Sequence, residues 1–65
     1  MKYAIEKIGC KGHAAIMAIN DRGNIIPVDR KRYRSVDAAQ MAANAYGLEI
    51  LAVGDLYQIL RAAGV

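Results

Sequence analysis

The chain has 65 residues, of which 55% are hydrophobic, and its formal net charge at pH 7 is +3. A chain of this length has room for one small core, so we expect a single domain over residues 1–65. One cysteine excludes an internal disulfide framework, and no apolar run approaches the roughly 18–20 residues of a membrane span. We therefore expect a cytoplasmic protein with no membrane partner.

Three strands are predicted in the first half of the chain. Lys2 to Ile8 alternates between apolar and charged residues, which is typical of a half-buried strand. His13 to Asn20 is apolar at nearly every position, which predicts a central strand that is covered on both faces. Asn24 to Val28 returns after a turn at Gly23, and Pro27 confines this third strand to an edge of the sheet.

The second half is predicted to hold two helices separated by a strand. Ser35 is a good N-cap and Gly47 a good C-terminal stop, so residues 35–47 form the central helix. Leu48 to Val53 is a fourth, mostly apolar strand, and Asp55 caps a last helix that runs through Ala63.

The element order β-β-β-α-β-α predicts a small α+β domain, with an antiparallel or mixed sheet and both helices packed on one face. The apolar arc of the central helix is too wide for a helix that lies on a single sheet. The second strand is also apolar on both sides. These two observations predict a homodimer, in which a second copy covers what the chain leaves exposed.

A cluster of cations lies just before the central helix: Arg30, Lys31, Arg32 and Arg34, with Tyr33 among them. Cations in this number can neutralise several phosphates, and a tyrosine can stack on an exposed base. We therefore expect these five residues to bind nucleic acid or a nucleoprotein, in a regulatory or accessory role. The alternative is a solvated loop that protects an edge strand.

A second function class is a protein–protein interaction module, such as a small inhibitor or adaptor of a larger complex. Its contact surface would be the apolar helix surface, with Val36, Ala39, Ala43, Tyr46 and Tyr57. Salt dependence separates the two classes, because affinity that rests on phosphate contacts falls steeply with salt.

The residue types present argue against catalysis and against a metal centre. With one His, one Ser and one Cys, the chain offers few groups that could converge on a reacting atom. Cys10 and His13 form a C-x-x-H pair, which is half of a tetrahedral metal site. Since the chain has no second Cys or His, we expect a non-catalytic protein with no metal and no cofactor.

Overall fold

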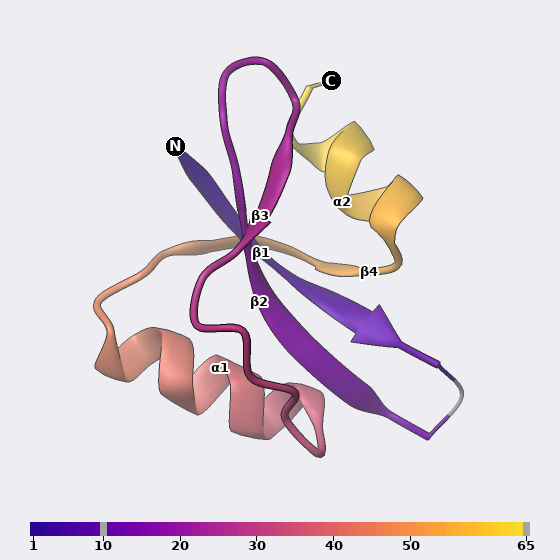
Figure 1. Cartoon of the computed structure of the whole chain (residues 1–65), viewed down its shortest axis with the longest axis vertical. Coiled ribbons are helices and arrows are strands. Elements are labelled where there is room, and N and C mark those ends of the chain that lie inside the picture. The colour runs from indigo at the N-terminus through magenta and orange to yellow at the C-terminus, as the bar shows by residue number, and fades with distance from the viewer. Residues whose placement is uncertain (10, 65) are drawn as a thin grey trace.

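The computed structural model describes residues 1–9 and 11–64, and its element order is the predicted β-β-β-α-β-α (Figure 1). The strands and helices are β1 (Lys2–Ile8), β2 (His13–Ile19), β3 (Ile25–Pro27), α1 (Val36–Ala45), β4 (Ile50–Gly54) and α2 (Leu56–Ala62). The radius of gyration is 10.6 Å, close to the roughly 10.7 Å expected for a compact chain of this length.

The four strands form one mixed sheet in the order β3-β2-β1-β4. β1 and β2 pair antiparallel along their whole length, from Lys2↔Ile19 to Ile8↔His13, and β2 pairs antiparallel with β3. β4 pairs parallel with β1. The central position predicted for the second strand is confirmed, as is the edge position that Pro27 indicated for the third.

The fourth strand begins two residues later than predicted, at Ile50, because Leu48 belongs to the end of the helix. The Leu48 amide donates to the Ala43 carbonyl at 2.9 Å, and the Gly47 amide donates to the Asn44 carbonyl at 3.0 Å. Gly47 has a positive φ of 76°. These are the two hydrogen bonds and the left-handed residue of a Schellman motif, which satisfies carbonyls that the helix end leaves without partners.

Both helices begin at the predicted caps. The Ser35 hydroxyl accepts from the Ala38 amide at 3.1 Å at the start of α1. Asp55 and Gln58 form a capping box at the start of α2, since each side chain accepts from the other residue's backbone amide. Gly54, just before this cap, is buried, and a Cβ atom there would collide with the Gln58 side chain.

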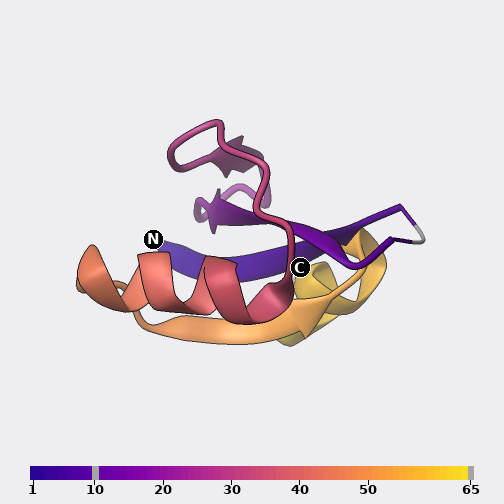
Figure 2. The same ribbon diagram turned by 90° about the horizontal axis from the view of Figure 1, so that it is seen from below.

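The prediction that both helices pack on one face is wrong: α1 and α2 cover opposite faces of the sheet. Ile5 and Ile16 pack against α1 through Ala39 and Ala43. Their neighbours of opposite parity contact α2: Ala4 and Ile19 pack against Ile59 and Ala63. The two helices accordingly lie on opposite sides of the strands in Figure 1, and in Figure 2 α1 is in front of the sheet and α2 behind it.

This arrangement has a simple physical cause. Successive side chains of a strand point to opposite faces, and the adjacent β1 residues Ala4 and Ile5 are both fully buried. The central strands therefore need a cover on each face. The last helix is the second cover, because it packs over Ala4 and Ile19. The sequence analysis expects a second copy of the chain in this role.

Candidate nucleic-acid interface

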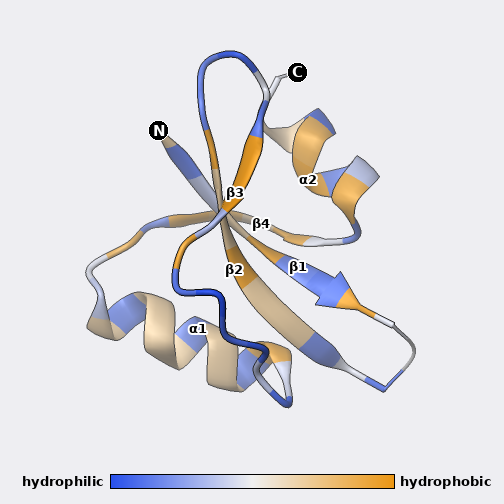
Figure 3. Ribbon diagram, in the orientation of Figure 1, coloured by the Kyte–Doolittle hydropathy of each residue, from blue (hydrophilic) through white to orange (hydrophobic). Residues whose placement is uncertain are grey.

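The predicted cationic cluster lies on an excursion of the edge strand, which we call the basic loop (residues 29–34). β3 leaves the sheet after Val28, whose amide donates to the Ile16 carbonyl at 3.0 Å. The chain returns at Tyr33, which exchanges both backbone hydrogen bonds with Ala14 at 2.7 and 3.0 Å. Residues 29–32 project between these two anchors, and this stretch is strongly hydrophilic in Figure 3.

One carboxylate organises the interior of this loop. Asp29 Oδ1 accepts from the Lys31 amide at 3.1 Å, and Oδ2 accepts from the hydroxyls of Tyr33 and Tyr46. Tyr46 is the C-cap of α1, and its hydroxyl lies 2.9 Å from the carboxylate oxygen. The loop is therefore tied to its own turn, to its return strand and to the end of the helix.

These contacts alter the acidity of the groups involved. Partial burial acts to raise the pKa of Asp29, but the hydrogen bonds from Tyr33, the Lys31 amide and Tyr46 together outweigh it, so the pKa lies below its ordinary value. The hydrogen bond to Asp29 raises the pKa of Tyr33, because it stabilises the neutral phenol. Asp29 is thus held as a carboxylate by hydroxyl donors.

Three of the predicted cations border a shallow groove with an apolar floor. Arg30, Lys31 and Arg32 line it on one side. The floor comes from the strands: Ile8, Ala15, Ile16, Met17 and Pro27. The groove has a volume of about 270 Å³. α2 covers the end of the β1–β2 pair at Ala4 and Ile19, and the groove lies toward the other end, at Ile8 and Ala15.

A second groove adjoins the first and adds a cation that the sequence analysis did not select. It shares Ile8 and Arg32 with the first groove and is otherwise lined by Gly9, Lys11 and His13. We call the combined surface the basic groove. The bridge between Tyr33 and Ala14 holds the basic loop beside the start of β2, and Lys11 and Arg32 line the same groove there. No local sequence pattern joins Lys11 to a cluster that begins at Arg30, so sequence reasoning had no signal for it.

The predicted site is not brought together completely. The Tyr33 ring packs against the core cluster under α1, and its hydroxyl is engaged with Asp29. Tyr33 is not among the residues that line the basic groove, and its stacking on a base stays a prediction. Arg34 is exposed but is not part of the groove lining.

The predicted protein-interface residues also separate. Ala39 and Ala43 have no exposed surface, and Val36 packs against the same core cluster. The prediction that the two alanines face a partner is wrong, because α1 uses them to approach the sheet closely. Tyr46 is 47% exposed and Tyr57 is 67% exposed, and the Arg61 guanidinium lies 5.6 Å from the centre of the Tyr57 ring.

Exposed apolar side chains lie elsewhere, on β4 and at the start of α2. They are Leu51, Val53, Leu56 and Tyr57, with exposed fractions of 41–67%. β4 is an edge of the sheet, and its outer side pairs with no strand among the described residues. The sequence analysis assigned Leu48 to Val53 to a strand but had no means of placing it at an edge.

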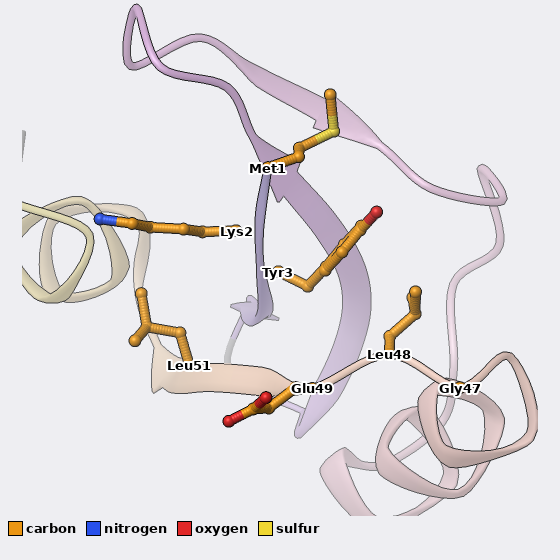
Figure 4. Close-up of a pocket in the computed structure, with 7 residues that line it drawn as sticks. All are labelled: Met1, Lys2, Tyr3, Gly47, Leu48, Glu49 and Leu51. Carbon is orange, nitrogen blue, oxygen red and sulfur yellow. The ribbon is translucent and has the colours of Figure 1, made fainter.

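A further surface depression, of about 400 Å³, lies between the start of β1 and the chain before β4 (Figure 4). Met1, Tyr3 and Leu48 line one part of it, and Lys2, Glu49 and Leu51 another. Lys2 points away toward α2, where its amine donates to the Ala63 carbonyl at 2.6 Å. The polar groups around this depression therefore diverge rather than meet at one point.

Within residues 1–9 and 11–64, no group of three or more potential metal ligands is found. Cys10, half of the C-x-x-H pair, lies outside the described residues, and His13 lines the basic groove. None of the described helices has the length and apolar character needed to cross a membrane. Comparison with protein-family models, with curated proteins and with solved structures gives no match.

Proposed function

We propose that this protein is an accessory module that binds nucleic acid through the basic groove. The observation that carries the proposal is the convergence of Lys11 with Arg30, Lys31 and Arg32, from two loops far apart in the sequence. Asp29, the nearest acid in sequence, is occupied by tyrosine hydroxyls and a backbone amide. These hydrogen bonds to Asp29 come from hydroxyls and an amide and not from a cationic side chain of the loop.

We expect the contacts to be mainly with the phosphate backbone. The described groove lining contains no Phe, Tyr or Trp, and the Tyr33 ring packs against the core. Stacking of bases on aromatic rings is the usual source of single-strand preference, and phosphate contacts carry no sequence information. The proposed binding is therefore steeply salt-dependent and weakly selective for sequence.

The test is a fluorescence-anisotropy titration with single- and double-stranded oligonucleotides at several salt concentrations. Replacing Arg30, Lys31 and Arg32 by Ala removes three charges and takes the net charge from +3 to 0. The slope of log affinity against log salt should fall by about 0.9 per lost phosphate contact on duplex, or about 0.7 on single strands. Lys11→Ala alone should lower this slope by about one unit, which corresponds to the loss of one phosphate contact.

A matched control replaces Lys7, Arg22 and Arg61 by Ala, which also takes the net charge from +3 to 0. If this control weakens binding as much as the groove variant, binding follows net charge and the groove is not the site. Glu6 adds a carboxylate to the same face of β1, since its register partner is Ala15. Glu6→Gln should therefore strengthen binding. Wild-type binding no tighter than millimolar at low salt contradicts the whole proposal.

A second proposal, from the protein–protein class, is self-association along β4 into a homodimer. An unpaired strand edge presents a row of backbone donors and acceptors to another strand. β3 is short, contains Pro27 and ends in the basic loop, so its edge is protected. β4, with the sequence ILAVG, has neither a proline nor a charge, and exposes Leu51 and Val53.

Light scattering of wild type and of Val53→Lys tests this second proposal. A lysine on the edge strand disfavours pairing with another strand. We expect wild type to exceed its monomer mass of 7.0 kDa at micromolar concentration and the variant to remain at that mass. Met41→Lys is the control, since Met41 is 72% exposed on α1. A wild-type mass of 7.0 kDa at every accessible concentration contradicts self-association.

A further inference from the structure

We propose that Asp29 is a positioning residue which, with the hydroxyls of Tyr33 and Tyr46, fixes the conformation of the basic loop and so sets its affinity for polyanions. We call this group the Asp29 latch. The inference rests on the proposed function, because it concerns the same cations. The inference adds that α1 influences these cations through Tyr46, although α1 does not line the groove.

The first argument is the convergence of three donors on one carboxylate. They come from the Lys31 amide two residues on, from Tyr33 at the return to the sheet, and from Tyr46 seventeen residues on in sequence. Hydrogen bonds to a charged acceptor are about twice as strong as bonds between neutral groups. A carboxylate with donors on both oxygens restrains the turn that carries Arg30 and Lys31.

The second argument is the backbone of Arg30, which has φ of 58°. A non-glycine residue is disfavoured in this left-handed region, because its Cβ atom crowds the following carbonyl oxygen. Such a conformation persists only where surrounding contacts over-determine it. The hydrogen bond from the Lys31 backbone amide to the Asp29 carboxylate connects the two residues on either side of Arg30. The latch is therefore positioned to hold Arg30 in this conformation.

The third argument is electrostatic. Asp29 is an anion beside the cations that are proposed to meet phosphates, and the charge of Lys31 contributes to its lowered pKa. By charge alone it opposes polyanion binding. Simple electrostatics and the latch therefore predict opposite signs for its removal, and this makes the inference testable.

Asp29→Asn raises the net charge from +3 to +4 and leaves the side chain nearly the same shape. If the latch positions the loop, this variant should bind oligonucleotides more weakly despite its higher charge, by roughly tenfold for the loss of charge-assisted bonds. Tyr46→Phe removes one hydroxyl without changing charge and should weaken binding by a few-fold. Tyr57→Phe, an exposed tyrosine on α2, is the matched control and should have no effect.

A second readout needs no ligand. Trypsin cleaves after Arg and Lys, so the rate of cleavage after Arg30, Lys31 and Arg32 reports how often the loop opens. Asp29→Asn and Tyr46→Phe should accelerate this cleavage severalfold below the unfolding transition, and hydrogen exchange at the Lys31 amide should accelerate with it. Tyr57→Phe should leave both rates at the wild-type values.

The outcomes separate the latch from the binding proposal. Tighter binding by Asp29→Asn, or unchanged cleavage in Tyr46→Phe, contradicts the latch while leaving the groove as a binding site. Faster cleavage in a protein that does not bind oligonucleotides supports the latch and overturns the proposed function. If Asp29→Asn does not fold, Tyr46→Phe decides the question alone, because it deletes only an oxygen from a half-exposed side chain.

Discussion

At Arg30 the backbone conformation favours a different residue type from the one that the groove uses. Its φ of 58° favours glycine, yet its side chain lines the basic groove. Arg30→Gly should remove roughly 1–2 kcal/mol of backbone strain and add about 0.5–1 kcal/mol of unfolded-state entropy. We expect a net gain of about 0.5–1 kcal/mol in the free energy of unfolding, measured by urea denaturation.

Lys31→Gly is the control for this prediction, because it deletes the neighbouring cation at a residue without positive φ. It should lower the free energy of unfolding by about 0.5–1 kcal/mol. If both glycine variants are destabilised equally, the left-handed conformation of Arg30 is not strained in solution. An arginine kept at a strained position would point to a use for its charge.

The acidity of Asp29 gives a prediction on pH. Its pKa is lower in the folded chain than in the unfolded chain, so its stabilising contribution is present above the unfolded value of about 3.9. That contribution is lost as the pH falls through the folded value. We expect the unfolding free energy of wild type to fall more steeply below about pH 4 than that of Asp29→Asn. Equal slopes for the two proteins contradict the hydrogen bonds assigned to Asp29.

At the scale of residues, the sequence predicts the caps well and the tertiary partners poorly. Ser35, Gly47 and Asp55 act as predicted because caps are set by neighbours in sequence. The cations on either side of Tyr33 predict an aromatic ring displayed to solvent. Its actual role depends on Ala14 and Asp29, and nothing in its immediate sequence identifies either as a partner.

At the scale of elements, α1 shows why an alanine-rich helix suits this sheet. Ala39 and Ala43 are fully buried against Ile5, Ala14 and Ile16. Small side chains allow the helix to approach the strands closely, which explains the wide apolar arc without a second sheet or a partner. The exposed part of that arc includes Met41, at 72%.

Ala43→Leu should therefore overpack the contact between α1 and the sheet. Overpacking a well-packed core costs about 1–3 kcal/mol, a large share of the stability of a small domain. We expect a lower melting temperature in a calorimetric or circular-dichroism melt. Ala45→Leu, at an exposed position two residues on, is the control and should melt near wild type. An unchanged melt for Ala43→Leu contradicts the close approach of α1.

The position of α2 illustrates a limit of reading elements from sequence. The order and type of all six elements follow from periodicity, caps and turns, which are local. The face that a helix covers depends on the path of the chain after β4. Because the adjacent residues Ala4 and Ile5 are both buried, each face of the sheet must be covered. A sequence pattern that calls for two covered faces fits a second copy of the chain as well as it fits α2.

At the scale of the whole molecule, the core is small. Its fully buried large side chains are Ile5, Ile16, Ile19 and Ile59, and most other core residues are alanines. Domains of this size often depend on an additional source of stability. The two edges of the sheet differ, since β3 is protected and β4 is apolar and open. Pairing along β4 would extend the sheet and bury part of the exposed Leu51 and Val53 side chains.

If β4 pairs with a second copy, the melting temperature should depend on protein concentration. Above the dissociation constant, a tenfold rise in concentration adds about 0.7 kcal/mol per protomer by mass action. For a domain of this length that is roughly 3–5 °C. The increase should vanish in Val53→Lys and persist in Met41→Lys. A wild-type melting temperature that does not change over a hundredfold range of concentration contradicts the pairing.

Salt adds a second, independent discriminator between the two proposed surfaces. Glu49 and Asp55 flank β4, and an antiparallel two-fold pairing brings the start of one strand near the end of the other. Like charges then meet at both ends of the paired strands, so added salt should screen their repulsion and strengthen the dimer.

The same salt should weaken the groove's binding to oligonucleotides, because those contacts release counterions. Sedimentation velocity and anisotropy on one salt series should therefore show dimerisation rising as nucleic-acid affinity falls. A dimer that weakens with salt in parallel with oligonucleotide binding would instead mean that the basic loop takes part in both, and the assignment of the dimer to β4 would be wrong.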